Sequence, residues 1–264
     1  MAVSIFAVLA VSMMAVLALC ASALAAAEAT KEQAPAAPAA AKGETPPKAG
    51  PAKAKAKAPR PDSALAPIDD VANLPRVLLI GDSISIGYTV AVRELLKGKA
   101  NVHHPPTNCS STVVGLKSLE AWLGDKKWDV IHFNWGLHDL KYIDEKGALA
   151  AADKGKQQVP LDEYEKNLRQ LVERLKKTGA RLIWCSTTPV PEGAAGRVPG
   201  DEARYNEVAA RVMKDNGVAT DDLYAFAKPR LKDIQQPRNV HFSAEGSKQL
   251  AQVVADTIEK ALGK

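Results

Sequence analysis

The sequence predicts an α/β fold in which a five-stranded parallel β-sheet lies between two layers of helices. Three observations support this fold class. Short apolar runs alternate with longer amphipathic stretches along residues 68–264, as in domains built from strand–helix–strand units. The runs are apolar at nearly every position, which is typical of strands covered on both faces. The stretches between them are long enough for the crossover helices that connect parallel strands.

The first half of this domain contains three of the expected strands. They occupy residues 76–80, with the sequence RVLLI, residues 101–104, which precede two prolines, and residues 128–133, with the sequence WDVIHF. Helices over residues 84–96 and 113–123 are expected between them. Because each helix returns the chain to the same end of the sheet, the three strands are expected to be parallel.

The second half of the domain has the same rhythm. Its clearest helix places apolar side chains of residues 164–175 on one face. A strand follows at residues 181–185, and another amphipathic helix around residues 205–213 leads to a weak strand at 218–220. Ser243 is the expected N-cap of the last helix, because its hydroxyl can accept a hydrogen bond from the first helical turn.

Two segments of different composition precede the domain. Residues 1–25 are expected to be a signal peptide, because residues 1–27 have no charged side chain and Ala23-Leu24-Ala25 has the small-x-small form of a cleavage site. Residues 26–67 are rich in Ala, Pro and Lys, so they are expected to form a disordered linker. The protein is thus expected to be exported, periplasmic or secreted, with no membrane span after signal cleavage. An uncleaved segment would instead anchor it in the membrane.

The charge distribution argues against nucleic-acid binding. The formal net charge is +5, and residues 26–67 contribute more than half of it, with seven Lys or Arg against four Asp or Glu. The domain itself is close to neutral, whereas nucleic-acid-binding domains concentrate positive charge on their folded part. Neither a metal site nor a glycine-rich phosphate loop is evident, so no metal and no cofactor are expected. Cys109 and Cys185 are expected to be free, buried thiols.

Four polar segments are expected to meet at one edge of the sheet. The first strand ends in Gly81-Asp82-Ser83, segments 106–112 and 134–139 follow the second and third strands, and segment 239–246 leads into the last helix. In a parallel α/β sheet the functional site lies beyond the carboxyl ends of the strands. A serine at such a strand-to-helix turn is exposed near a helix N-terminus, which favours developing negative charge.

These four segments resemble the sequence blocks of the SGNH, or GDSL-type, hydrolase family. The resemblance covers residues 74–262 and consists of GDS, a small polar turn, GLHD and a histidine before the last helix. It implies a flavodoxin-like three-layer α/β/α sandwich and hydrolysis of esters, often acyl groups on carbohydrates or lipids. By this resemblance Ser83 is the nucleophile and His241 is the general base.

The resemblance also implies an oxyanion hole formed by the backbone N–H groups of Ser83 and Ser110 and by the side chain of His138. Ser110 stands where the family has glycine, and His138 stands where it has asparagine. A serine supplies the same N–H and is costly only where the turn requires positive φ. A neutral imidazole supplies one N–H donor if its tautomer is fixed. Alternatively, Asn108 or Asn134 donates to the oxyanion and His138 has a packing role.

The acid of the family's DxxH block is absent, because Arg238 stands three residues before His241. A backbone carbonyl, Asn239 or a carboxylate from elsewhere would have to orient the histidine ring. Asp139 is adjacent to His138 and is expected to hydrogen-bond to a turn, with contact to the catalytic groups as the alternative. The expected machinery is a Ser–His pair, less efficient than a complete triad.

The sequence thus predicts an exported serine esterase that hydrolyses a carboxylic ester. Its expected target is a short acyl group, such as O-acetyl, on a carbohydrate, so that the partner is a small-molecule or glycan ester. Long loops at residues 140–160 and 189–200 are expected to border the substrate. Two alternatives remain, namely a lysophospholipase or thioesterase of the same fold and a degenerate, non-catalytic glycan-binding domain.

Overall fold

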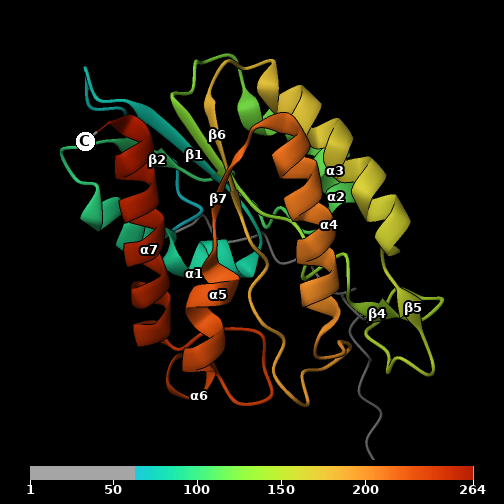
Figure 1. Cartoon of the computed structure of the whole chain (residues 1–264). Helices are drawn as coiled ribbons and strands as arrows, with labels where there is room; N and C mark the ends of the chain where they lie inside the picture. Colours follow the sequence, from blue (N-terminus) through green and yellow to red (C-terminus); the bar gives the residue numbers. More distant parts are fainter. Residues whose placement is uncertain (1–62, 264) are drawn as a thin grey trace, which may run out of the picture. The chain divides into compact units, whose positions relative to one another are not determined.

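The computed structural model describes residues 63–263, which fold around a five-stranded parallel sheet (Figure 1). The strands are β1 (Arg76–Ile80), β2 (Asn101–His103), β3 (Val130–Phe133), β6 (Arg181–Cys185) and β7 (Ala219–Asp221). They lie in the order β2-β1-β3-β6-β7, which is the order of flavodoxin-like folds. Every neighbouring pair is parallel, which confirms the fold class expected from the sequence.

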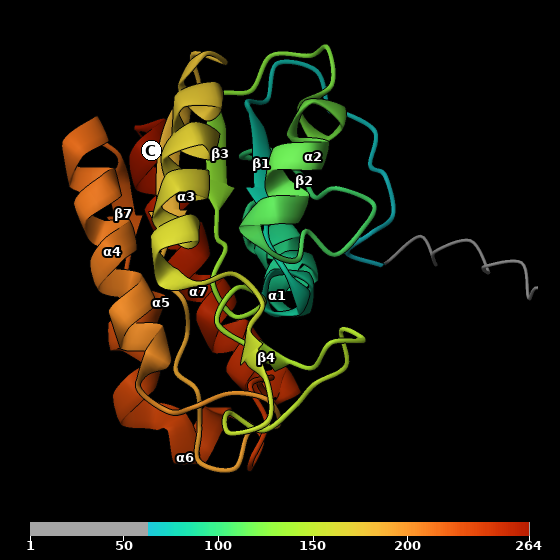
Figure 2. The ribbon, with the colours of Figure 1, turned by 90° about the vertical axis from the view of Figure 1, so that its right-hand side faces the viewer.

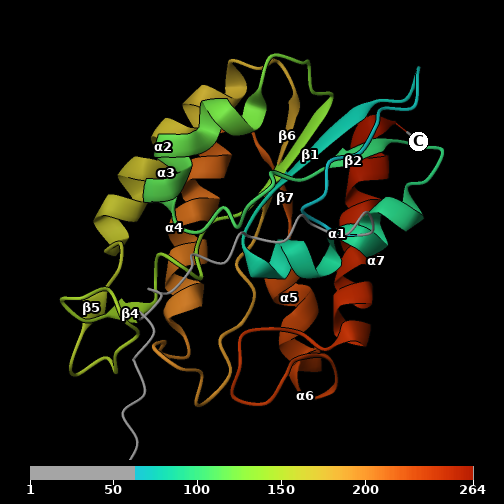
Figure 3. The ribbon, with the colours of Figure 1, turned by 180° about the vertical axis from the view of Figure 1, so that it is seen from behind.

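Helices cover both faces of this sheet. The long helices are α1 (Ser83–Leu95), α2 (Thr112–Leu123), α3 (Leu161–Lys176), α4 (Asp201–Asn216) and α7 (Ala244–Leu262). Figures 1 and 3 show α1 and α7 on one side of the sheet and α2, α3 and α4 on the other. Ser243 caps α7 as expected, since its hydroxyl accepts a hydrogen bond of 2.9 Å from the backbone N–H of Gly246.

Alternate strand side chains form a separate apolar core under each helix layer. Phe133 and Trp184 point toward α2, α3 and α4 and belong to one core. Leu79 and Ile183 point the other way and pack with α1 and α7 in the second core. Because both faces of the strands are buried, the sheet is a rigid support for the segments that follow its carboxyl ends.

The sequence pattern does not predict several short elements. The loop after β3 contains an antiparallel pair, β4 (Tyr142–Ile143) and β5 (Lys156–Gln157), and β4 lies beyond the start of α3 (Figure 2). Between β7 and α7 the chain forms α5 (Leu223–Ala227), the 3-10 helix η1 (Lys228–Arg230) and α6 (Leu231–Ile234). Elements this short cannot establish a hydrophobic period, so pattern alone does not identify them.

The packed domain begins before residue 68. Ala64 and Ala66, which the sequence pattern assigns to the linker, are buried. Arg93 of α1 donates hydrogen bonds to the backbone oxygens of Ser63, Ala64 and Ala66, at 3.0, 3.1 and 3.3 Å. The guanidinium group therefore holds this turn against α1, and the domain starts a few residues earlier than composition indicates.

The expected signal peptide at residues 1–25 lies outside the described residues, as does most of the expected linker. Both assignments stay predictions. Across residues 63–263, no helix is both long and apolar enough to span a lipid bilayer.

The two cysteines of the domain, Cys109 and Cys185, are free and buried, as expected. Burial raises the pKa of the Cys109 thiol to about 12 and raises the pKa of Cys185 well above its usual value. Both thiols therefore stay protonated at neutral pH, and the protonated form is the unreactive one.

Candidate active site

Ser83 and His241 are in contact although 158 positions separate them in the sequence. Ser83 is the first residue of α1 and follows the turn at the end of β1. Asp82 caps this helix, because its carboxylate accepts a hydrogen bond of 2.9 Å from the backbone N–H of Ile84. The Ser83 Oγ atom lies 2.8 Å from Nε2 of His241. This is the arrangement expected of a nucleophile and its general base.

A neutral amide orients the ring of His241. Oδ1 of Asn239 lies 2.7 Å from Nδ1 of His241 and also accepts the backbone N–H of His241, at 3.1 Å. An acceptor at Nδ1 places the ring proton there and leaves Nε2 free to take the proton of Ser83. Arg238, the residue before Asn239, has a left-handed φ of 56°. Among the three orienting groups considered from the sequence, the structure thus shows Asn239 in contact with His241.

Backbone hydrogen bonds join the segments that follow the strands. The N–H of Cys109 donates to the oxygen of Gly81 at 3.0 Å, and the N–H of Asn134 donates to the oxygen of Ile80 at 2.9 Å. The turns after β1, β2 and β3 are therefore connected directly, as expected for the carboxyl edge of a parallel sheet.

Close packing explains two glycines of the site. A Cβ at Gly136 would lie 2.0 Å from Oγ1 of Thr187, and a Cβ at Gly81 would lie 2.6 Å from Cβ of Ser85. Only glycine leaves room for the side chains of Thr187 and Ser85 at these distances. The glycines of the GDS and GLHD segments are therefore required by packing against the neighbouring turn and helix.

Ser110 occupies a turn that glycine would adopt more easily, since its φ is 52°. Its backbone N–H donates to Oδ1 of Asn108 at 2.9 Å, and its Oγ lies 3.2 Å from Nδ1 of His138. The expected oxyanion donor at Ser110 thus already has an acceptor, which an oxyanion would have to share or replace. The amide nitrogen of Asn108 has no partner in the described part of the chain, so it is available to a substrate.

The side chain of His138 is uncharged at neutral pH. It is half-buried, and burial is the main reason that its pKa lies below the usual value. The carboxylate of Asp82 opposes this shift, whereas the positive charges of Lys141 and Arg197 and the ring of His241 lower the pKa further. A neutral imidazole with the Ser110 hydroxyl donating to Nδ1 carries its proton on Nε2, where it can serve as a hydrogen-bond donor.

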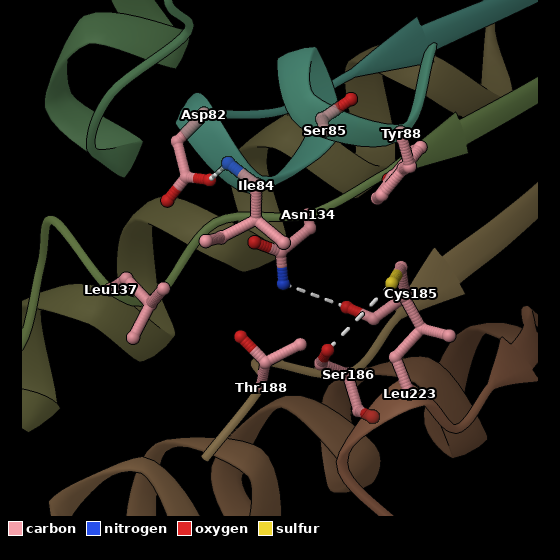
Figure 4. A pocket seen from close by; sticks show the side chains of 10 residues that line it. All are labelled: Asp82, Ile84, Ser85, Tyr88, Asn134, Leu137, Cys185, Ser186, Thr188 and Leu223. Carbon is pink, nitrogen blue, oxygen red and sulfur yellow. Dashed lines mark hydrogen bonds between the residues drawn. The ribbon is translucent and has the colours of Figure 1, made fainter. Parts of the chain in front are cut away.

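Asn134 and Asp139 lie near the site without contacting Ser83 or His241. The amide nitrogen of Asn134 donates to the backbone oxygen of Cys185 at 2.8 Å (Figure 4), and it lies 3.3 Å from Oγ1 of Thr187. Asn134 therefore connects β3 to β6, and the alternative in which it donates to the oxyanion is not supported.

Asp139 has the turn-stabilising role expected from the sequence. Its Oδ1 accepts hydrogen bonds from the backbone N–H of Thr112 at 2.8 Å and from the hydroxyl of Thr112 at 2.6 Å. Its Oδ2 is buried without a hydrogen-bond partner among the described residues. The carboxyl group thus joins the start of α2 to the segment after β3, and it has no catalytic contact.

We expect Asp139 to make the fold less stable as the pH rises. Burial raises the pKa of Asp139 to about 7, against the opposing hydrogen bonds from Thr112. Because the unfolded carboxyl group ionises near pH 4, stability falls between about pH 4 and pH 7, by up to about 4 kcal/mol. Denaturant unfolding at pH 5 and pH 8 should show a smaller difference between the two pH values in Asp139→Asn than in the parent. The exposed Asp153→Asn is the control, and an unchanged pH difference in Asp139→Asn would contradict the assignment.

A small cavity lies beneath the start of α1 and is too small for a substrate. Its volume is about 10 Å³, and its lining includes Ser85, Tyr88 and Thr188 (Figure 4). The hydroxyl oxygens of Ser85 and Thr188 are buried without a hydrogen-bond partner in the described residues. A volume of this size accommodates about one water molecule. An ester must therefore approach Ser83 from the exposed side, where His241 lies.

His132, Cys185 and Asp221 are buried together, and their ligand-type atoms lie within 4.8 Å of one another. Nε2 of His132 lies 2.8 Å from Oδ2 of Asp221, so these two side chains satisfy each other. The group is therefore better described as a hydrogen-bonded pair with a neighbouring thiol. His132 is thus a buried histidine whose ring has a hydrogen-bond partner.

Comparison with known proteins gives one family match and one curated relative. Residues 79–249, more than half of the chain, match the GDSL-like lipase/acylhydrolase family. A GDSL esterase/lipase of Arabidopsis thaliana is 39% identical over 90 residues, which cover 31% of this chain and 37% of the plant protein. The chain thus aligns with little more than a third of that relative.

Solved structures of the same architecture include three ester hydrolases. A lipase/acylhydrolase from Enterococcus faecalis has a TM-score of 0.59 at 18% identity, over 71% of this chain and 96% of that chain. The acetyl xylan esterase AlAXEase has a TM-score of 0.57 at 18% identity, over 69% and 99%. An acetylxylan esterase from Geobacillus stearothermophilus has a TM-score of 0.56 at 20% identity, over 72% and 94%. At these identities the likeness establishes the fold.

Proposed function

The chain belongs to the GDSL-like lipase/acylhydrolase family, and from this premise we propose that it is a serine esterase that removes a short acyl group, such as acetyl, from a carbohydrate. The observation that carries the proposal is the 2.8 Å contact between Ser83 Oγ and His241 Nε2. A non-catalytic glycan-binding domain would have no need to keep these two atoms in proton-transfer distance.

In the proposed mechanism, Ser83 Oγ attacks the carbonyl carbon of the ester while its proton passes to Nε2 of His241. Asn239 stabilises the productive ring orientation through Nδ1. The tetrahedral intermediate expels the alcohol, which takes the proton from His241. Water then attacks the acyl group on Ser83, again with His241 as the base, and the carboxylic acid leaves.

Three donors are proposed for the oxyanion of the intermediate. The backbone N–H of Ser83 lies in the first turn of α1, where helical N–H groups have no acceptor within the helix. The N–H of Ser110 joins it by exchanging or sharing its acceptor on Asn108. The third donor is Nε2–H of His138, held in this tautomer by the hydroxyl of Ser110. Preorganised donors of this kind supply a large part of the rate enhancement in acyl transfer.

Two observations support a short acyl group on a carbohydrate. Acetyl xylan esterases are among the structures with the same fold. In addition, residues 1–25 are expected to direct export, and an exported enzyme would meet polymeric glycans. Export remains part of the proposal.

An apolar groove favours a second candidate, a lysophospholipase or thioesterase. The groove has a volume of about 630 Å³ and runs between α1 and α7, with Gly87, Val90, Leu95 and Phe242 in its lining. Phe242 follows His241 directly, and Gly87 lies one helical turn after Ser83. A long acyl chain could therefore extend from the reacting carbonyl along this groove.

A substrate panel tests both candidates. Initial rates would be measured with acetylated sugars, short p-nitrophenyl esters and a lysophospholipid, each with the Ser83→Ala variant as the control. We expect acetyl esters to have a kcat/KM at least about tenfold above that of the lysophospholipid, because the cavity of about 10 Å³ beneath the start of α1 cannot enclose a long acyl chain. A preference for the long acyl chain would assign the groove as its binding site. No Ser83-dependent hydrolysis of any ester would contradict the esterase proposal itself.

A further inference from the structure

Two positively charged side chains stand beside the active site without a carboxylate partner. Lys141 follows His138 by three residues and is the one half-buried lysine among residues 63–263. Arg197, on the loop before α4, is also half-buried. Neither forms an ion pair with an acidic side chain in the described part of the chain. Charged side chains are seldom withdrawn from water unless they are paired.

Backbone contacts hold these two residues next to each other and next to His138. The backbone N–H of Tyr142 donates a hydrogen bond of 2.7 Å to the backbone oxygen of Gly196. Tyr142 follows Lys141 and Gly196 precedes Arg197, so this bond brings the two charged residues together. Nε of Arg197 donates to the backbone oxygen of Leu137, the residue before His138, at 3.0 Å. Both residues therefore lie at the side of the site where the oxyanion is proposed to form, and the guanidinium of Arg197 is held there by its own hydrogen bond.

The other half-buried arginines show how different Arg197 is. Arg76 pairs with Asp70 and Arg174 pairs with Glu120. Arg93 uses all three guanidinium nitrogens on backbone oxygens. Arg197 uses Nε and Nη1 on backbone oxygens, which leaves Nη2 without a partner among the described residues.

The pKa values of both side chains are lowered in this arrangement. Burial lowers the pKa of Lys141, and the charge of Arg197 lowers it further, while Asp139 opposes both. Burial also lowers the pKa of Arg197, and only Asp82 opposes it. The carboxylate of Asp82 already accepts a hydrogen bond from the backbone N–H of Ile84, and that of Asp139 accepts one from the backbone N–H of Thr112. An external anion would relieve the repulsion between the two cations.

We propose that Lys141 and Arg197 form a subsite for a carboxylate group of the ester substrate. The inference rests on the proposed function, because it gives a substrate class to the same site. The planar guanidinium of Arg197 offers donors suited to a carboxylate, and the ammonium of Lys141 adds a second positive charge. The carboxylate belongs either to an acidic sugar, as in an O-acetylated uronate, or to the acyl group, as in a hemisuccinate.

Binding to the Ser83→Ala protein tests the subsite without turnover. Galacturonate, succinate and the neutral sugar galactose would be titrated by calorimetry or NMR. We expect at least one carboxylate to bind about tenfold or more tightly than galactose, as charge-assisted hydrogen bonds allow. Tighter binding of galacturonate assigns the carboxylate to the sugar, and tighter binding of succinate assigns it to the acyl group.

Further substitutions in the Ser83→Ala protein show which side chains cause the preference for a carboxylate. We expect Lys141→Met and Arg197→Gln to remove the preference for the carboxylate, whereas Lys146→Met, an exposed lysine of the same loop, should retain it. Lys141→Met is the cleaner variant, because the Lys141 side chain makes no hydrogen bond in the described structure, whereas Arg197 supports the Leu137 carbonyl. Thermal unfolding of each variant checks that the domain is intact.

Two results would overturn the subsite, namely equal binding of all three probes and a carboxylate preference that survives both substitutions. Failure of the esterase proposal is a separate result, because it would appear as the absence of Ser83-dependent hydrolysis in the substrate panel and leaves the binding measurement interpretable.

Discussion

The Ser83→Ala variant is expected to lose ester hydrolysis by at least about 10⁴-fold, because it removes the hydroxyl that lies in contact with the proposed general base, His241. A fluorophosphonate probe should label the parent protein covalently at Ser83 and should not label the variant. Mass spectrometry of the labelled peptide identifies the modified residue. Labelling of the parent that continues unchanged in Ser83→Ala would show that another residue is the nucleophile.

The His241→Ala variant belongs to the same test. It removes the base that contacts Ser83, and residues that act as one unit have non-additive effects. We expect His241→Ala to lose nearly as much activity as Ser83→Ala and the double variant to lose little more. Fluorophosphonate labelling should be greatly slowed in His241→Ala while the domain remains folded. A multiplicative loss in the double variant would mean that the two side chains act independently.

Replacing His138 with alanine has the second-largest expected effect, a loss of about 10²–10³-fold in kcat with little change in KM. The reason is that an oxyanion-hole donor acts chiefly on the transition state. Asn108→Ala is the matched comparison, because the amide nitrogen of Asn108 is the competing donor on the turn at Ser110. We expect Asn108→Ala to lose less activity than His138→Ala.

The reverse order of these two losses would assign the donor to Asn108 and return His138 to a packing role. The pH profile provides a second check on the same point. Because burial lowers the pKa of His138 below its usual value, its neutral form predominates at pH 7, and the parent should show no gain from protonated His138 near neutrality. A rise in kcat as the pH falls through 7 that disappears in His138→Ala would contradict the neutral-donor assignment.

Much of the fold could be predicted because the strands and long helices have strong periodic signals. The run RVLLI is buried at every position after its first residue, as a central parallel strand requires. The β4–β5 pair and the elements from α5 to α6 have no such signal, since their conformation depends on contacts with the rest of the domain. Composition places residues 63–67 in the linker, and it cannot show that Arg93 binds the backbone of this segment.

The two groups of the catalytic pair could be identified because each belongs to a short segment at the edge of the sheet. The residues that support this pair could not be predicted from the sequence with the same precision. Asn239 is one of three candidates for orienting His241, and only the folded loop shows that its Oδ1 lies 2.7 Å from Nδ1 of the ring. Asn134 and Asp139 are polar, lie in the GLHD region and look functional in sequence, yet their side chains are used by Cys185 and Thr112.

The state of the two thiols has a consequence for where the domain can work and how it can be produced. Cys109 lies in the turn next to Ser110, but its thiol is shielded and protonated, and the fold contains no bond between Cys109 and Cys185. The catalytic geometry therefore does not depend on the oxidising power of the surroundings. The same architecture should form in the reducing interior of an expression host and in an oxidising extracellular medium.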